Sequence, residues 1–348
     1  MRLWNVTIPD RKRNGVRPAG VPEPFFRHPF FFHSKYRKME EIMKEKTFAR
    51  RARADWKRNR ALYLLVVPVI IFYIVFHYKP MYGAIIAFKD YTPALGVGGS
   101  PWVGLDNFTR FFTGPYFGRL LKNTVLLSVY ELAFGFPAPI ILALLLNELR
   151  NRKFKSLAQT VSYLPHFISM IVVTGMITNF AMTSGLFNDL IVFFGGERSP
   201  LLQNPKLYRT IYVASSVWQE AGWGSIIYLS ALAGVDSQLY EAASIDGAGK
   251  WKQLIHVTMP AIAPTIIVML ILRMGTLMSL GYEKTILLYN PSTYETADII
   301  SSYIYRVGLL DQDWSYSTAI GLFNSVINCT LLLITNKLSK KFSDTSLW

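Results

Sequence analysis

The chain has 348 residues, of which 51% are hydrophobic and only 17% are charged, and its formal net charge at pH 7 is +15. That balance is unusual for a soluble domain and typical of a polytopic membrane protein. Residues 1–60 contain 17 Lys and Arg against 6 Asp and Glu, so one terminal segment holds most of the excess positive charge. Because this charge is not spread over a folded face, we expect no nucleic-acid partner.

The basic segment 1–60 precedes the first apolar run of membrane length. A basic tail in that position fixes topology or contacts anionic lipid head groups. We therefore expect a partly disordered or surface-lying cytoplasmic arm, with room for a short amphipathic helix from Ser34 to Lys57.

Six stretches are long and apolar enough to cross a bilayer, because a spanning helix needs about 20 mostly apolar residues. They lie at 61–79, 121–147, 157–182, 210–233, 261–281 and 317–337. Several contain Pro or Gly, which packed transmembrane helices tolerate. The sequence therefore predicts an all-α membrane protein with six transmembrane helices over residues 61–338 and a short cytoplasmic tail over 339–348.

The connecting segments set the expected orientation. Segment 148–156 carries four basic residues against one acidic residue, and segment 336–342 carries three basic residues and no acidic one. An even number of crossings places both on the same side as the N-terminal arm, and the positive-inside rule makes that side cytoplasmic. Segment 234–260 then also lies in the cytoplasm. The longer loops that fall outside are 80–120, 183–209 and 282–316.

The stretch 237–260 is polar and rich in small residues, although it lies between two apolar segments. It predicts two short helices, of which Ser237 can cap the first, and Glu241 near its start suits the helix dipole. The run Asp246-Gly247-Ala248-Gly249 breaks the helix, because glycine adopts the left-handed conformation readily. The result is a cytoplasmic elbow whose small residues permit close approach by another protein. From the residues alone, a docking role and a plain connecting loop both remain open.

The same stretch resembles the EAA signature of ABC-importer permeases. The matching residues are Glu241, Ala242, Ala243, Gly247, Val257, Met259 and Pro260, with Val and Met standing where Ile and Leu are usual. In that family the elbow is a coupling helix that docks in a groove of a cytoplasmic ATPase. The resemblance therefore implies an ATPase-coupling role for Glu241, Ala242, Ala243, Asp246, Gly247 and Gly249.

The resemblance covers about residues 60–340. "VGLDNFTRFF" followed by "LLKNTVLLS" is similar to the entry of the second span in type I sugar permeases. "YLPHFISMIVVTGM" and "GYEKTILLYNPSTYETADIISSYIYRVGL" resemble the subgroup that serves complex oligosaccharides and polysaccharide fragments. The resemblance thus implies the type I ABC importer permease fold in a bacterial inner membrane. It leaves open which sugar is carried, with alginate-like fragments, pectic oligosaccharides and shorter glycans among the candidates.

The resemblance also implies the partners. These are a second homologous permease subunit, two ATP-binding subunits, an extracytoplasmic solute-binding protein, the saccharide substrate and membrane lipid. This chain contains no GxxxxGK[ST] phosphate loop and no His, Asp and Glu set with metal-ligand spacing, and its single thiol, Cys329, excludes an intrachain disulfide. We expect Cys329 to be a small buried residue. We expect the chain to be non-enzymatic and to bind no cofactor or metal, while ATP and Mg are used by the ATP-binding subunits.

Sugar-binding chemistry suggests the pathway residues, since aromatic rings stack on sugar faces and amides and carboxylates bind hydroxyl groups. The candidates are Trp218, Gln219, Glu220 and Trp223 on the fourth span, and Asn324 and Asn328 one turn apart on the sixth. A carboxylate within a span is costly unless it faces a cavity or a partner. Interface-belt positions for the tryptophans and interhelical hydrogen bonds for the asparagines remain alternatives.

Other ionisable residues in the expected spans have plainer explanations. Glu131 and Arg273 can neutralise one another or Glu220, and His166 can satisfy backbone groups freed by Pro165. The alternative function, an ion-coupled secondary transporter, would use Glu131, Glu220 and Arg273 as its coupling site. That class does not explain the cytoplasmic elbow, so the sequence favours the ABC permease.

Overall fold

The computed structural model describes residues 53, 55–342 and 345–347. Most of the arm expected over residues 1–60, including much of the helix expected from Ser34 to Lys57, lies outside the described residues and stays a prediction. The chain divides into two compact units, Met1–Tyr78 and Lys79–Trp348, and each is described by itself. In the first unit, the chain is helical from Asp55 onward and includes the π-helical segment η1, Ile74–Tyr78.

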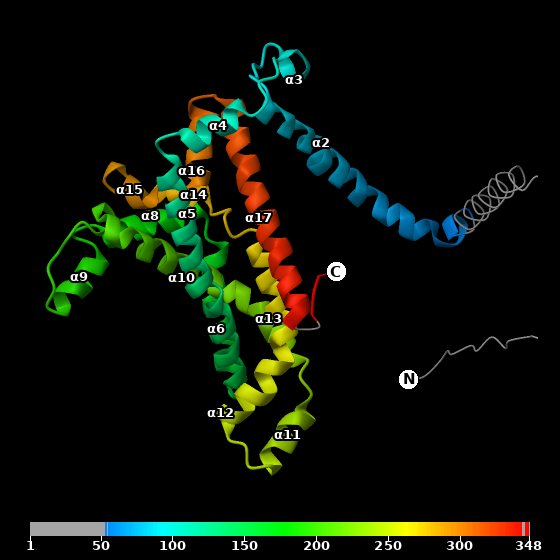
Figure 1. Ribbon diagram of the computed structural model, residues 1–348. Coiled ribbons are helices and arrows are strands. Elements are labelled where there is room, and N and C mark those ends of the chain that lie inside the picture. The colour runs from blue at the N-terminus through cyan, green and yellow to red at the C-terminus, as the bar shows by residue number, and fades with distance from the viewer. Residues whose placement is uncertain (1–52, 54, 343–344, 348) are drawn as a thin grey trace, which may run out of the picture. The chain divides into compact units, whose positions relative to one another are not determined.

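The second unit is built from helices joined by turns (Figure 1). Its α-helices are α2 Lys79–Met81, α3 Gly96–Gly99, α4 Asp106–Thr113, α5 Phe117–Tyr130, α6 Pro137–Glu148, α7 Arg152–Tyr163, α8 Met170–Ala181, α9 Leu186–Phe193, α10 Pro205–Ala233, α11 Ser237–Ile245, α12 Lys250–Gln253, α13 Met259–Met274, α14 Tyr282–Leu288, α15 Tyr294–Ala297, α16 Ile300–Tyr305 and α17 Trp314–Phe342. Its 3-10 or π-helical segments are η2 Tyr82–Phe88, η3 Glu131–Gly135, η4 Leu164–Phe167, η5 Leu201–Gln203, η6 Leu254–Thr258, η7 Pro291–Thr293 and η8 Arg306–Leu310. The described residues contain no β-strand, only one isolated bridge between Lys89 and Trp102, so the expected all-α class is confirmed.

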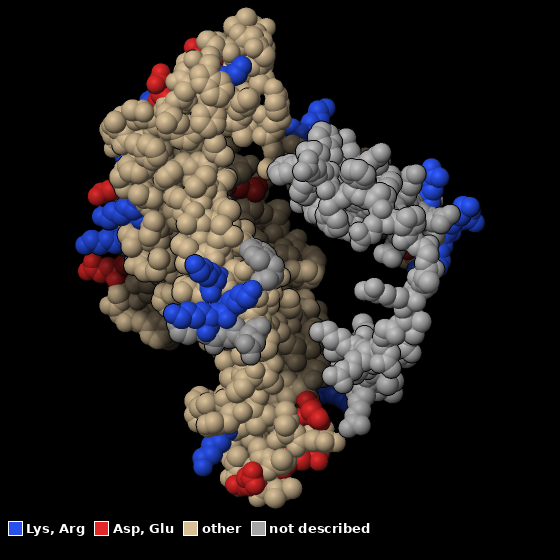
Figure 2. Space-filling model, turned by 45° about the vertical axis from the view of Figure 1, so that its right-hand side comes forward, with Lys and Arg blue, Asp and Glu red and all other residues tan. Residues whose placement is uncertain are grey.

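Five helical stretches of the described residues are long and apolar enough to cross a membrane. They are Asp55–Phe88, Phe117–Glu148, Met170–Phe193, Lys250–Met274 and Trp314–Lys341. The one remaining expected span, the fourth at 210–233, corresponds to α10, which has 29 residues but is less apolar because polar side chains such as Gln219 and Glu220 interrupt it. Uncharged residues cover most of the face that Figure 2 shows, as a membrane-embedded protein requires.

The third expected span, 157–182, is wrong as one continuous helix. The helix stops at α7 and restarts at α8, because Pro165 in η4 has no backbone N–H to donate and restricts the residue before it. The candidate span therefore shifts to Met170–Phe193. The end of α7 instead lies tightly against α10, where a Cβ atom at Gly222 would collide with the carbonyl oxygen of Ser162.

Two cores surround α10. In one, Ile140 of α6, Tyr228 of α10 and Ile262 of α13 are buried together. In the other, Tyr212 of α10 packs with residues of α5 and α8 and with Leu288 of α14. Because the second core reaches α14, it holds a short helix from the 282–316 loop directly against the middle of α10.

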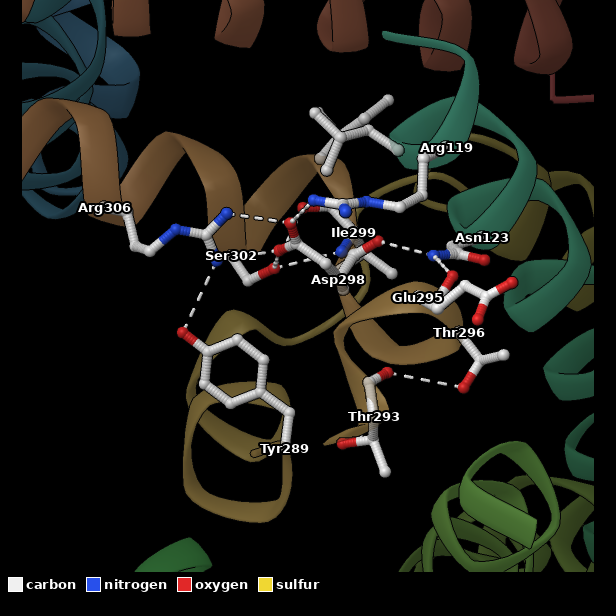
Figure 3. Close-up of polar contacts among 12 residues, drawn as sticks. Arg119, Asn123, Tyr289, Thr293, Glu295, Thr296, Asp298, Ile299, Ser302 and Arg306 are labelled. Carbon is white, nitrogen blue, oxygen red and sulfur yellow. Dashed lines mark hydrogen bonds and ion pairs between the residues drawn. The ribbon is translucent and has the colours of Figure 1, made fainter. Parts of the chain in front are cut away.

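The buried carboxylate of Asp298 holds the 282–316 loop to α5 (Figure 3). Its side chain is 0% exposed, and it accepts two hydrogen bonds of 2.8 Å from Arg306 and one of 3.3 Å from Arg119 of α5. The hydroxyl of Ser302 donates a further bond of 2.8 Å. The hydrogen bond with Asp298 raises the pKa of Arg306 above its ordinary value. Asn123 of α5 completes the attachment by donating to the Asp298 carbonyl oxygen at 3.0 Å.

We predict that Asp298→Asn lowers the free energy of unfolding by about 3–5 kcal/mol, because it leaves two guanidinium groups without their buried counter-charge. Thermal unfolding of the purified protein in detergent measures this loss. Asp313→Asn is the matched control, since Asp313 pairs with Arg110 at 2.6 Å but the two side chains are 30% and 61% exposed. That pair contributes about 0–1 kcal/mol. Equal losses in the two variants would contradict the role given to Asp298.

Candidate functional site

A cavity of about 560 Å³ lies between α10, α13, α14 and the η3–α6 region. Three of the pathway residues expected from sequence, Gln219, Glu220 and Trp223, are in its wall. The other charged residues in the wall are Glu131, Arg273 and Lys284. A larger hollow of about 840 Å³ is lined by Asp189 and Arg198, which pair with each other near the surface. The smaller cavity is the candidate site, because it brings ring, amide and charged groups together between the long helices.

Glu131 and Arg273 face each other across this cavity. The Arg273 guanidinium lies 3.7 Å from Glu131 Oε2, and the Glu131 side chain is only 8% exposed against 38% for Arg273. Glu131 begins the π-helical segment η3, and Gly135 one turn later leaves room for its carboxylate. Of the partners that the sequence left open for Arg273, the structure brings Glu131 closest.

His166, Glu220 and Trp223 form a second polar group beside the cavity. His166 Nδ1 lies 3.0 Å from Glu220 Oε2, and the imidazole stacks on the Trp223 indole with ring centroids 4.6 Å apart and planes 2° apart. The break at Pro165 makes this contact, because it turns η4 toward α10. His166 therefore contacts side chains of α10, beyond the backbone role expected for it.

The other expected pathway residues lie elsewhere. Trp218 is 47% exposed and does not line the cavity. Asn324 and Asn328 are buried within α17, and Asn328 accepts a hydrogen bond from the Met278 backbone N–H at 2.9 Å and donates to Ser279 Oγ at 2.8 Å. The cavity wall includes neither asparagine. The adjacent Cys329 is exposed on the surface of the chain, so the expectation that it is buried is wrong: it faces away from the core side of α17.

Lys284 is the cavity residue that the sequence analysis missed. It lies on α14, is 3% exposed, and donates hydrogen bonds to the Tyr212 carbonyl oxygen at 2.9 Å and to Ser216 Oγ at 2.6 Å. A lysine in a loop expected outside the membrane carries no local signal of burial. The surrounding run "GYEKTILLY" is largely apolar apart from its Glu-Lys pair, and this apolar context is the signal in the sequence that could have indicated a buried Lys284.

The elbow expected at 237–260 is formed by α11, a turn, and α12. Asp236, not Ser237, caps α11, because its carboxylate accepts the Gln238 N–H at 2.9 Å, so the expected cap is wrong by one residue. Gly247 has φ +75°, the left-handed conformation that ends the helix. Gln253 closes the turn by donating to the Ala248 carbonyl oxygen at 3.0 Å. Figure 1 places this elbow at the opposite end of the second unit from α4.

Most residues of the elbow are exposed on the surface of the chain. The six residues to which the resemblance gives a coupling role all lie on it, and all are exposed except the half-buried Ala243. Two large apolar side chains are also exposed there, Ile245 at 86% and Trp251 at 72%. Exposed apolar groups of this size on a rigid turn suit contact with another protein.

The chain matches the family model described as binding-protein-dependent transport system inner membrane component over residues 135–344. The chain belongs to this family. It is 46% identical over 292 residues to the polygalacturonan/rhamnogalacturonan transport system permease protein YteP of Bacillus subtilis (strain 168), covering 84% of this chain and 91% of that protein. It is also 46% identical over 296 residues to Protein LplB of the same organism, covering 85% and 93%.

The fold of this permease matches a chain from the crystal structure of a bacterial alginate ABC transporter in complex with an alginate pentasaccharide-bound periplasmic protein. The TM-score is 0.77 and the sequence identity 41%, over 84% of this chain and 99% of that chain. The resemblance to ABC-importer permeases and the expected importer fold are therefore confirmed. The permease is an inner membrane component of a binding-protein-dependent transport system, which fits the expected non-enzymatic role.

For this permease we predict that Glu131→Gln and Arg273→Met are coupled. Glu131→Gln should lower the melting temperature by leaving a guanidinium without its counter-charge, and adding Arg273→Met should restore part of the loss. The expected coupling energy is about 0.5–3 kcal/mol in a double-mutant cycle. The matched control is the cycle of Asp189→Asn with Arg198→Met, whose side chains are 54% and 42% exposed. Additive effects at both sites would rule out a stabilising Glu131–Arg273 pair.

Proposed function

We propose that this permease forms half of the translocation pathway of an ATP-driven importer for oligosaccharides or polysaccharide fragments. The observation that carries this proposal is the chemistry of the 560 Å³ cavity. There the Trp223 ring, the Gln219 amide and the Glu220 carboxylate share one wall, which suits a ligand with apolar ring faces and many hydroxyl groups. Relatives named for polygalacturonan and arabinooligosaccharide transport support the same substrate class. Pectic and alginate-like fragments are the candidates that we favour.

The energy would come from partner subunits that act on the elbow. We propose that two ATP-binding subunits, which use ATP and Mg, dock at Glu241, Ala242, Ala243, Asp246, Gly247 and Gly249. Closure of those subunits would move the elbow, and the helix that starts at Lys250 would carry the motion to Arg273 in the cavity wall. A shift between inward- and outward-facing populations then moves the sugar. The exposed Ile245 and Trp251 supply apolar contact area for the docked subunit.

The remaining partners follow from the same assignment. We propose a second homologous permease as the other half of the pathway and an extracytoplasmic solute-binding protein that delivers the sugar. Both termini and the elbow would then face the cytoplasm, as the basic segments 148–156 and 336–342 indicate. The exposed apolar side chains of the long helices would contact membrane lipid and the partner permease.

We predict that Gly247→Leu abolishes stimulation of ATP hydrolysis by the loaded binding protein. A branched side chain at φ +75° costs about 1–2 kcal/mol and deforms the turn on which docking depends. ATPase activity and co-purification of the ATP-binding subunits measure the effect in the assembled complex. Gly195→Leu is the matched control, since Gly195 has φ +84° and equally open surroundings but lies in the loop after α9. Normal stimulation in the Gly247 variant would refute the coupling role.

We also predict that Glu220→Gln and Trp223→Ala each reduce saccharide uptake about tenfold while leaving membrane insertion and assembly unchanged, because the first weakens a charge-assisted acceptor for sugar hydroxyl groups and the second removes a stacking surface. Uptake into proteoliposomes that contain the full complex measures this effect. A complex with this chain as its sole permease is the negative control and should not transport. Unimpaired uptake in both variants would end the pathway assignment, and uptake that persists without ATP-binding subunits would favour the ion-coupled alternative.

A further inference from the structure

The ammonium group of Lys284 lies in the cavity wall with part of its bonding capacity unused. An ammonium has three N–H donors, and among the described residues Lys284 Nζ uses two, to the Tyr212 carbonyl oxygen and to Ser216 Oγ. The same atom lies 4.6 Å from the centroid of the Tyr212 ring, so the ring face also stabilises the charge. These contacts hold the side chain in place but supply no negative charge.

The other charged groups in the cavity each have a close polar partner. Glu131 has the opposite charge of Arg273 at 3.7 Å, and Glu220 has the His166 imidazole at 3.0 Å, which adds a positive charge only when it is protonated. None of the ion pairs among the described residues includes Lys284, although it is 97% buried. A buried charge is expensive unless it is paired, so a lysine kept here without a carboxylate calls for a counter-ion from elsewhere.

We propose that Lys284 binds the carboxylate of an acidic saccharide and thereby makes the cavity selective for uronic-acid oligomers over neutral ones. This inference rests on the proposed transport function and adds the charge of the substrate to it. A uronate brings the missing anion, and the third N–H of Lys284 makes a charge-assisted hydrogen bond to it. Trp223 and Gln219 line the same wall, although Gln219 already donates an amide N–H to the Ile168 carbonyl oxygen at 3.3 Å. The cavity volume lies within the range of about 300–1,000 Å³ that small-molecule sites occupy.

The competing explanation is that Lys284 only balances the two carboxylates across the cavity. The negative charges of Glu131 and Glu220 do act on Lys284 at longer range. In that case the lysine would matter for stability, and its loss would affect acidic and neutral sugars alike. The two explanations therefore differ in whether the effect of the lysine depends on the charge of the sugar.

The test compares trigalacturonate with its fully methyl-esterified form, which has the same rings and linkages but no charge. Equilibrium binding is measured by calorimetry on the detergent-solubilised complex of this permease, its partner permease and the ATP-binding subunits. The binding protein is omitted so that its own selectivity does not contribute. The wild-type complex should bind the acid at least about tenfold more tightly than the ester, since one charge-assisted hydrogen bond contributes about that factor. Equal affinities, or no binding of either sugar, would overturn the proposal without any variant having to fold.

Lys284→Met should weaken binding of the acid about tenfold or more and leave binding of the ester nearly unchanged. Lys206→Met is the matched control, because it removes an exposed lysine from the start of α10 that does not line the cavity. The affinities for the acid and for the ester should stay the same in Lys206→Met. A general effect of positive charge would instead weaken binding of the acid in both lysine variants. Equal weakening of acid and ester in Lys284→Met would favour the balancing role and reject the proposal.

Uptake of either sugar in proteoliposomes that contain the loaded binding protein is measured in parallel. This second measurement distinguishes a failure of the proposed selectivity from a failure of the proposed transport function.

Discussion

The ion pairs of the buried Asp298 carboxylate hold the loop that carries Lys284, one of the cavity charges, against α5. Arg306 belongs to the same loop as Asp298, whereas Arg119 comes from α5, so a single anion joins the loop to a long helix. In a largely apolar bundle such cations are tolerated only with a counter-charge. Because α14 lies in the same loop, the ion pairs of Asp298 also help to position Lys284 beside Tyr212. A contact outside the cavity wall thus helps to determine where a charged side chain lies inside the cavity.

The elbow and the cavity share one structural element. The helix Lys250–Met274 has 25 residues and is about 37 Å long at 1.5 Å per residue. It starts at the elbow and carries Arg273 in its last turn. The 3.7 Å separation between Arg273 and Glu131 exceeds the roughly 2.7–2.9 Å of a strong charge-assisted hydrogen bond. The pair is therefore weaker than an ion pair at close contact, which suits the rearrangement proposed for the cavity when the elbow moves.

The parts that sequence could predict are those with local causes. The length of an apolar run predicts the long helices, and the Gly247 turn follows from backbone sterics. The break at Pro165 was missed because packed transmembrane helices tolerate proline, so its presence in the sequence alone does not show that the helix stops there. Helical spacing placed Asn324 and Asn328 on one face but did not tell which neighbour that face meets. The burial of Lys284 depends on Tyr212, 72 residues away, and no local pattern encodes such a contact.

A transport site of the kind proposed for this cavity differs from a tight binding site. The two protein hydrogen bonds of Lys284 and the nearby Tyr212 ring hold the ammonium in position when no ligand is present, but they supply no counter-charge. Under the proposal for Lys284, an arriving carboxylate would accept one further N–H bond and supply the missing counter-charge. A pathway needs binding that is strong enough to admit the ligand and weak enough to release it. A cation held by neutral acceptors meets both requirements, whereas a preformed ion pair would meet neither.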